Sequence, residues 1–191
     1  MSPYKPGDSV LILGGGPIGL AVLQALTAKG EVGTLIVSEM SPKRKEFAKE
    51  FGATHVLDPR HDDIIAKCRE LCDGQGVHVV FDAAGVQAGL DQAIHSVRAL
   101  GTIVNIAVWE KPCTIFPNDL VFKERKYIFV ATYRLGDFQE VLEAISTGKI
   151  KPERMITKRI NLNEVVEEGF NALVKDKDNQ VKILVKAAGG D

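Results

Sequence analysis

The chain passes from an apolar run into glycines and then into a helical pattern at VLILGGGPIGLAVLQALTAK (residues 10–29). Residues 10–13 are continuously apolar, which is typical of a strand buried on both faces of a parallel sheet. From Leu20 onward the apolar spacing predicts a helix, and Gly30 is a suitable residue to end it. The segment is therefore predicted to be a strand, a tight turn and a helix.

Glycines 14, 16 and 19 in this turn have the G-x-G-x-x-G spacing. Gly14 permits the reversal of the chain, Gly16 lets the backbone approach a pyrophosphate, and Gly19 lets the helix pack closely on the strand. The free N–H groups at the start of the helix attract phosphate. Because a single match to this motif is weak, its context has to decide whether it is a dinucleotide site.

Apolar runs alternate with helical patterns along the next hundred or so residues. Further strands are expected at residues 34–38, 55–57, 77–82, 101–107 and 127–131, and helices at 43–51, 64–71 and 88–99. This alternation predicts an α/β fold, a doubly wound parallel six-stranded Rossmann sheet with helices on both faces. Residues 111–117 are interpreted as an edge segment whose ends are protected by prolines.

The regular alternation of expected strands and helices ends after the sixth strand. We expect residues 1–133 to form the Rossmann domain and residues 134–191 to form a C-terminal α/β tail. Within the tail, helices are expected at 138–146 and 164–173 and strands at 155–160 and 181–185.

Length and composition exclude several classes of protein. A chain of 191 residues buries a sufficient core without disulfides, and its three cysteines fit a reducing compartment. A formal net charge of −1 gives no electrostatic case for nucleic acid or a membrane surface as partner. The chain shows no apolar run long enough to span a membrane and no secretory leader, so we expect a cytoplasmic protein.

Glu39 supplies the second half of the dinucleotide pattern. It ends the second expected strand, where a carboxylate can accept both hydrogen bonds from an adenosine ribose diol. The same carboxylate repels a 2′-phosphate and so favours NAD over NADP. The alternative reading is a solvated acid near a helix start. Lys43 and Arg44 could hold a 2′-phosphate, but we rank Glu39 above them.

Other candidate chemistry is sparse. The four histidines have no metal-site spacing, and no nucleophile motif is present. Cys68 and Cys72 lie one helical turn apart and could share a metal, but without a second pair they are interpreted as packing thiols. Asp82 ends a strand at the edge where ligands bind, and there a structural role is as plausible as a catalytic one. Small residues follow two strands, at 83–85 and 106–108, and are interpreted as rims that touch a cofactor, although small residues are also common in tight loops.

Four segments carry a resemblance to a known family: PGDSVLILGGGPIGL, VSEMSPKRKEFAKEFGA, FDAAG and NIAVWEKP. From about Lys5 to Lys186 the chain resembles the cofactor domain of zinc-dependent medium-chain alcohol and polyol dehydrogenases, especially the butanediol and sorbitol branch. The resemblance implies NAD as cofactor, with contacts grouped by its parts: Gly14, Gly16, Pro17, Ile18 and Gly19 at the pyrophosphate; Glu39 and Arg44 at the adenosine ribose; Ala83 and Ala84 at the adenine; Ile106, Ala107, Val108, Val130 and Thr132 at the nicotinamide; and Lys182 as a basic pyrophosphate contact.

The chain departs from that family in one respect. Members hold a catalytic zinc with a Cys, a His and a Glu, mainly in an N-terminal domain, and the zinc lowers the pKa of the alcohol. Neither those ligands nor the four-cysteine structural zinc site is recognisable here. We therefore expect no catalytic residue and no metal ligand in this chain. It would bind NAD(H) and act on a small alcohol or polyol only together with the missing domain.

The resemblance implies two further surfaces. Residues from Arg134 onward would pack on the missing domain and otherwise expose an apolar patch. A homodimer would form through the sheet edge near Ile115. Two alternatives stay open at this point: a stand-alone nucleotide-binding or interaction module without catalysis, and a methyltransferase, which also places glycines after one strand and an acid after the next.

Overall fold

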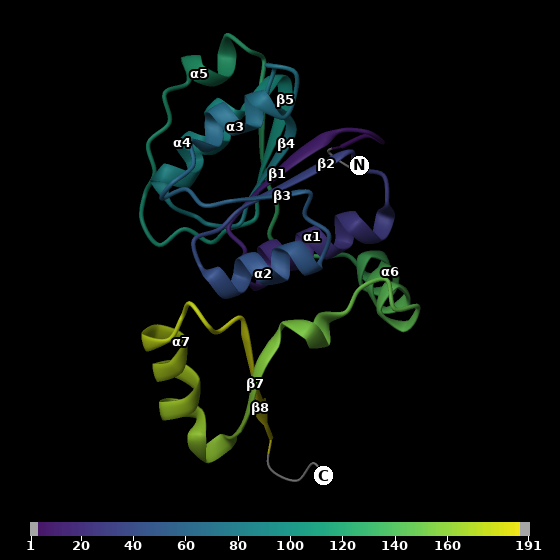
Figure 1. Ribbon diagram of the computed structural model, residues 1–191, viewed down its shortest axis with the longest axis vertical. Helices are drawn as coiled ribbons and strands as arrows, with labels where there is room; N and C mark the ends of the chain where they lie inside the picture. The colour runs from purple at the N-terminus through teal and green to yellow at the C-terminus, as the bar shows by residue number, and fades with distance from the viewer. Residues whose placement is uncertain (1–3, 188–191) are drawn as a thin grey trace.

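A computed structural model describes residues 4–187 and contains a six-stranded parallel sheet (Figure 1). The strand order is β3-β2-β1-β4-β5-β6. The chain winds from β1 outward to β3 and then returns to β4 beside β1, so the order reverses between β1 and β4. The predicted doubly wound sheet is confirmed. Its strands are β1 (Ser9–Leu13), β2 (Thr34–Ser38), β3 (His55–Leu57), β4 (Val77–Asp82), β5 (Val97–Asn105) and β6 (Lys126–Phe129).

Helices cover both faces of this sheet, as Figure 1 shows. On one face α1 (Pro17–Lys29) and α2 (Pro42–Glu50) pack with Val10 and Ile12 of β1. On the other face α3 (Ile64–Glu70) and α4 (Gln87–Ser96) pack with Leu11 and Leu13. Because β1 is buried on both sides, its continuous apolar run is what the fold requires.

The C-terminal segment forms a separate unit beside α1 and α2 (Figure 1). Here β7 (Ile156–Asn161) and β8 (Lys182–Lys186) pair in parallel as a two-stranded sheet. The connections are α6 (Leu135–Ser146), η1 (Pro152–Met155), η2 (Leu162–Glu164), the π-helix η3 (Val165–Asn171) and α7 (Ala172–Lys175).

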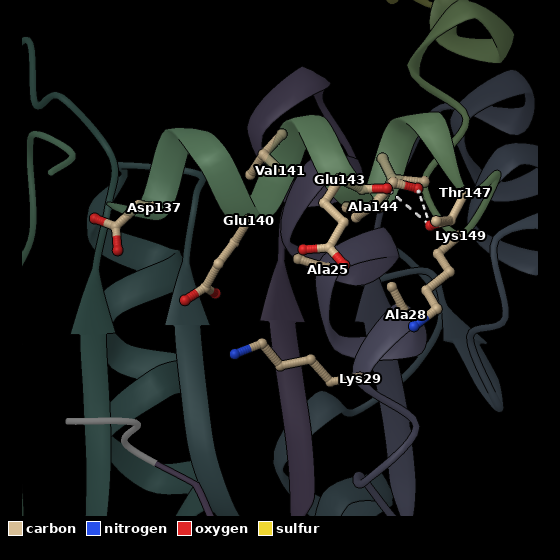
Figure 2. Close-up of a pocket in the computed structure, with 11 residues that line it drawn as sticks. Ala25, Ala28, Lys29, Asp137, Glu140, Val141, Glu143, Ala144, Thr147 and Lys149 are labelled. Atoms are coloured by element: carbon tan, nitrogen blue, oxygen red, sulfur yellow. Dashed lines mark hydrogen bonds between the residues drawn. The ribbon is translucent and has the colours of Figure 1, made fainter. Parts of the chain in front are cut away.

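Three kinds of contact attach this segment to the Rossmann unit. Val181 is buried in the α1–α2 core, and Arg154 forms an ion pair with Glu50 at 2.7 Å. The backbone N–H of Lys151 donates to Gln24 Oε1 at 2.8 Å. By contrast, α6 leaves a cavity of about 330 Å³ against α1, where Val141 and Ala144 lie opposite Ala25 (Figure 2). The tail is therefore fixed at its β7–β8 side and packs loosely at α6.

The structure corrects several details of the sequence reading. Residues 111–117 form no strand; β6 is the edge of the sheet, and a short helix α5 (Asn118–Val121) precedes it. Pro112 and Pro117 lack the N–H groups that a ladder needs. The helix expected to reach residue 99 ends at Ser96, because Val97 is buried and pairs with Val77 to begin β5. The helix expected at 164–173 is mostly π-helix.

The three cysteines are free and differ in burial, which gives a direct test of the packing around α3. Cys68 is fully buried, and this burial raises the pKa of its thiol from an ordinary value near 9 to about 12, whereas Cys113 is exposed. The Cys68 thiol therefore stays protonated in the folded state at pH values where it ionises in the unfolded state. The free energy of unfolding is expected to fall as the pH rises above about 9, the ordinary pKa of the thiol.

In native protein at pH 8, a thiol reagent such as Ellman's reagent is expected to modify Cys113 quickly and Cys68 only after unfolding. The comparison is the number of thiols that react before and after addition of guanidinium. Equal reaction rates for all three thiols in the folded protein would contradict the core as described.

Candidate functional site

The glycine turn between β1 and α1 lies at the carboxyl edge of the sheet. Gly14 has a φ of +91°, and its N–H donates to Ser38 O at 2.9 Å. A Cβ on Gly19 would lie 1.8 Å from Gly14 O, so no side chain fits there. A Cβ on Gly16 would meet nothing within 4 Å, so the start of α1 faces open space. Pro17 at the first helical position needs no N–H partner.

Glu39 connects this turn to the end of β2. Its side chain is buried; Oε2 accepts the N–H of Gly15 at 2.6 Å, and Oε1 accepts those of Met40 at 2.8 Å and Ser41 at 2.7 Å. A carboxylate has about four acceptor positions, so these three bonds leave it able to accept another. The predicted ribose acid therefore also shapes the turn.

A cavity of about 310 Å³ lies where these elements meet. Its walls come from the ends of β1 and β2, the turn after β3 and the start of α4, and they include Gly14, Glu39, Arg60, Ala84, Val86 and Gly89. The walls are mainly apolar, and the volume is at the small end of the range for organic ligands. Its position at the carboxyl ends of parallel strands is where open α/β sheets bind ligands.

Asp82 fixes both small-residue rims. Its Oδ1 accepts the N–H groups of Ala84 at 2.9 Å and Gly85 at 3.1 Å. Its main-chain oxygen accepts those of Ile106 at 2.9 Å and Ala107 at 3.1 Å. Because the Asp82 side chain is fully buried, the structure favours the structural reading of this residue over the catalytic one.

The remaining predicted contacts at the carboxyl edge follow β5 and β6. Val108 is almost fully exposed, and Asn105 Nδ2 supports its loop by donating to Ala107 O at 2.9 Å. Val130 is exposed, and its N–H donates to Asn105 O at 3.0 Å; Thr132 follows it at the surface. The structure thus places all the predicted residues of β1, β2, β4, β5 and β6 at one edge.

Two predicted contacts have other surroundings. Arg44 lies on α2, and its Nη2 donates to the main-chain oxygens of Lys177 and Gln180, each at 3.0 Å. Lys182 lies on β8 opposite Ile156, in the two-stranded sheet rather than the six-stranded one. Neither position was foreseeable, because both depend on how the tail packs.

Sequence reasoning missed the residues that follow β3. Arg60 lines the cavity, and its guanidinium donates to Asp58 Oδ1 from Nε at 2.9 Å and to Oδ2 from Nη2 at 2.7 Å. Lys45 Nζ donates to the same Oδ2 at 2.6 Å. These donors, Arg60 first, hold the pKa of Asp58 well below its usual range. A signal was available: Asp58, Pro59 and Arg60 come directly after a strand, at its carboxyl end.

Metal ligands do not gather anywhere in the part of the chain that the structure describes. Between residues 4 and 187, no three histidine, cysteine or acidic side chains lie close enough to hold an ion. Over the same residues, every helix is too short or too polar to cross a bilayer. His78, one of the residues considered as a ligand, instead contacts Ser9, with its Nδ1 2.9 Å from the hydroxyl oxygen.

Comparison with known proteins decides the family. A family model described as "Zinc-binding dehydrogenase" matches residues 17–147. The chain belongs to the zinc-binding dehydrogenase family. Within this family it is similar to (R,R)-butanediol dehydrogenase of Bacillus subtilis strain 168, with 42% identity over 185 residues, 97% of this chain and 52% of that protein.

Solved structures of dehydrogenases agree with this assignment. The crystal structure of 2R,3R-butanediol dehydrogenase from Bacillus subtilis superposes with a TM-score of 0.85 at 40% identity, covering 96% of this chain and 52% of that one. An alcohol dehydrogenase from Escherichia coli CFT073, solved with NADH, has a TM-score of 0.85 at 26% identity, covering 96% and 53%. The chain spans about half the length of the curated dehydrogenases it matches.

Proposed function

We propose that this chain is the NAD(H)-binding part of a zinc-type, butanediol-like alcohol or polyol dehydrogenase. The observation that carries the proposal is the meeting of the glycine turn, the Glu39 carboxylate and the cavity of about 310 Å³ at one edge of the sheet. The residues present fit a dinucleotide: space is open in front of Gly16, a buried acid borders the cavity, and the cavity wall is mainly apolar.

Each part of the site has a distinct task in this proposal. The turn at residues 14–19 holds the pyrophosphate in the open space in front of Gly16, where the first free N–H groups of α1 bind it, since those of Gly14 and Gly15 are already bonded within the protein. Glu39 uses its remaining acceptor position for a hydroxyl of the adenosine ribose, and the cavity beside Ala84 takes the adenine. The rim at residues 106–108, with Val130 and Thr132, seats the nicotinamide, and Arg44 and Lys182 are further proposed contacts. When bound, NAD accepts a hydride from an alcohol; this chain binds and orients it.

The catalytic part of the reaction belongs to another region in this proposal. We propose residues 1–133 as the cofactor-binding domain and residues 134–191 as a segment that packs on a zinc-holding catalytic domain. The exposed apolar side chains of α6 support this: Leu135, Phe138 and Leu142 are each at least half exposed. In this proposal zinc and a small alcohol or polyol bind in that catalytic domain. The protein is proposed to be cytoplasmic and to form a homodimer through the segment near Ile115.

A stand-alone nucleotide-binding or interaction module without catalysis is the second candidate. The glycine turn, the Glu39 carboxylate and the cavity beside them would serve such a module equally well. Sequencing the gene on both sides of the region that encodes this chain distinguishes the two candidate functions. A continuous reading frame that encodes Cys, His and Glu zinc ligands would support the proposal that the chain is part of a dehydrogenase.

Isothermal titration calorimetry tests the binding proposal directly. NADH is expected to bind one molecule per chain, NADPH is expected to bind at least about tenfold more weakly because Glu39 repels the 2′-phosphate, and S-adenosylmethionine is expected not to bind. Tight binding of S-adenosylmethionine with no heat from NADH would favour the methyltransferase alternative and refute this proposal.

A further inference from the structure

One carboxylate holds two cations beside the ribose end of the proposed site. Asp58 follows β3, and its oxygens accept the Nε and Nη2 groups of Arg60 and the Nζ of Lys45. The backbone N–H of Arg60 adds a bond to Asp58 Oδ1 at 3.1 Å. Arg60 lines the same cavity as Glu39, so this ion cluster borders the place where the adenosine ribose is proposed to bind.

The other charged groups near this end of the cavity have partners as well. Arg60 Nη2 also donates to Met40 O at 2.6 Å. Arg44 is bound to main-chain oxygens of the tail, and Lys43 Nζ lies 3.1 Å from Glu46 Oε2. The negative charges that act on Arg60 are those of Asp58, Asp178 and Glu39. Each nearby cation is thus matched by an acceptor before any cofactor arrives.

A 2′-phosphate makes demands that this arrangement does not meet. It carries a charge of about −1.5 to −2 at neutral pH and is stabilised by arginine or lysine donors. Arginine is the strongest such donor, because its guanidinium can bond two phosphate oxygens at once. Here the guanidinium edge of Arg60 formed by Nε and Nη2 is already used by Asp58.

We propose that Asp58 is a selectivity-determining residue for the cofactor. By holding Arg60 and Lys45, it keeps both cations from a 2′-phosphate, and it acts together with the direct repulsion by Glu39. The site therefore selects the unphosphorylated adenosine ribose of NAD(H). This inference rests on the proposed function and adds a second residue, which does not touch the cofactor, to its selectivity.

The primary test is Asp58→Asn, measured by titration with NADH and NADPH and with the short probes 5′-AMP and 2′,5′-ADP. Freed from the carboxylate, Arg60 is expected to tighten binding of NADPH and 2′,5′-ADP by about tenfold, while NADH and 5′-AMP change less than about twofold. Asp63→Asn is the matched control: it removes a charge from the same loop, and asparagine can still cap α3 through Ala66 N–H.

Arg60→Ala provides a test of opposite sign that stands even if Asp58→Asn does not fold. The substitution removes one positive charge beside the proposed ribose site and leaves Asp58 paired with Lys45 alone. Because a 2′-phosphate loses that nearby charge, NADPH binding is expected to weaken at least about threefold more than NADH binding. The double variant Asp58→Asn/Arg60→Ala is expected to lose the NADPH gain of the single variant.

Three outcomes would overturn the inference while the proposed function stands. These are a folded Asp58→Asn protein with unchanged NADPH affinity, an Arg60→Ala protein that binds NADPH better, and a wild-type protein that binds NADPH as tightly as NADH. A folded wild-type protein that binds none of the four compounds would instead refute the proposed function itself, and the inference with it.

Discussion

Gly19→Ala is expected to destabilise the protein by about 3 kcal/mol and to remove measurable NADH binding. The packed backbone around Gly19 has no room for an added methyl group. The added methyl would lie 1.8 Å from the carbonyl oxygen of Gly14 and 3.3 Å from Cγ2 of Ile12. Since both neighbours belong to the central strand and its turn, α1 has to move away from the sheet. Denaturant melts and an NADH titration measure the two effects.

Gly16→Ala is the matched control in the same turn. Its Cβ would meet no protein atom within 4 Å, and Gly16 has a φ of −70° that alanine adopts freely. The denaturation midpoint is expected to stay unchanged, while NADH affinity falls at least about tenfold because the methyl occupies space proposed for the pyrophosphate. Unchanged NADH affinity in Gly16→Ala would place the cofactor elsewhere.

Leu11→Ala is expected to reduce the free energy of unfolding by about 3–5 kcal/mol, as for other large-to-small changes in close-packed cores. Leu11 is fully buried on the central strand and packs in the core beneath α3 and α4. Its neighbours are held by strands on both sides, so the cavity cannot collapse. Urea melts at neutral pH measure the change.

Leu135→Ala makes the same chemical change on α6, where the side chain is 76% exposed. Its effect is expected to stay within about 0.5 kcal/mol, as for other surface substitutions. If Leu135→Ala destabilised the chain as much as Leu11→Ala, the apolar face of α6 would be buried in solution, in a homodimer for example, and the exposed surface described here would be wrong.

Local sequence pattern was enough to predict the Rossmann sheet and to name most residues of the candidate site. Continuous apolar runs such as residues 10–13 reflect burial on both faces, and this property is visible in the sequence itself. The glycine spacing reports local backbone geometry, so the roles of Gly14 and Gly19 could be stated before any coordinates. Glu39 could also be foreseen, because it ends the second strand and the position of that strand in the sheet follows from the winding order.

Long-range packing explains what the sequence did not reveal. Arg44 turns to the carbonyl oxygens of Lys177 and Gln180, which lie more than 130 residues further along the chain. The ion cluster around Asp58 joins the turn after β3 to α2, a pairing that no periodicity encodes. The sequence indicates an edge segment at residues 111–117, but Pro112 and Pro117 lack ladder N–H groups and Ile115 packs against the core, so β6 forms the edge instead.

A map of amide chemical-shift changes on adding NADH to isotope-labelled protein tests the proposed binding site most directly. Binding at the carboxyl edge of the sheet is expected to shift the amides of the turn at residues 14–19, of Met40 and Arg60, and of residues 83–86 and 106–108, with little change in α3 and none in α7. Saturable shifts confined to the α1–α6 cavity, or no shifts in a folded protein at millimolar NADH, would contradict it.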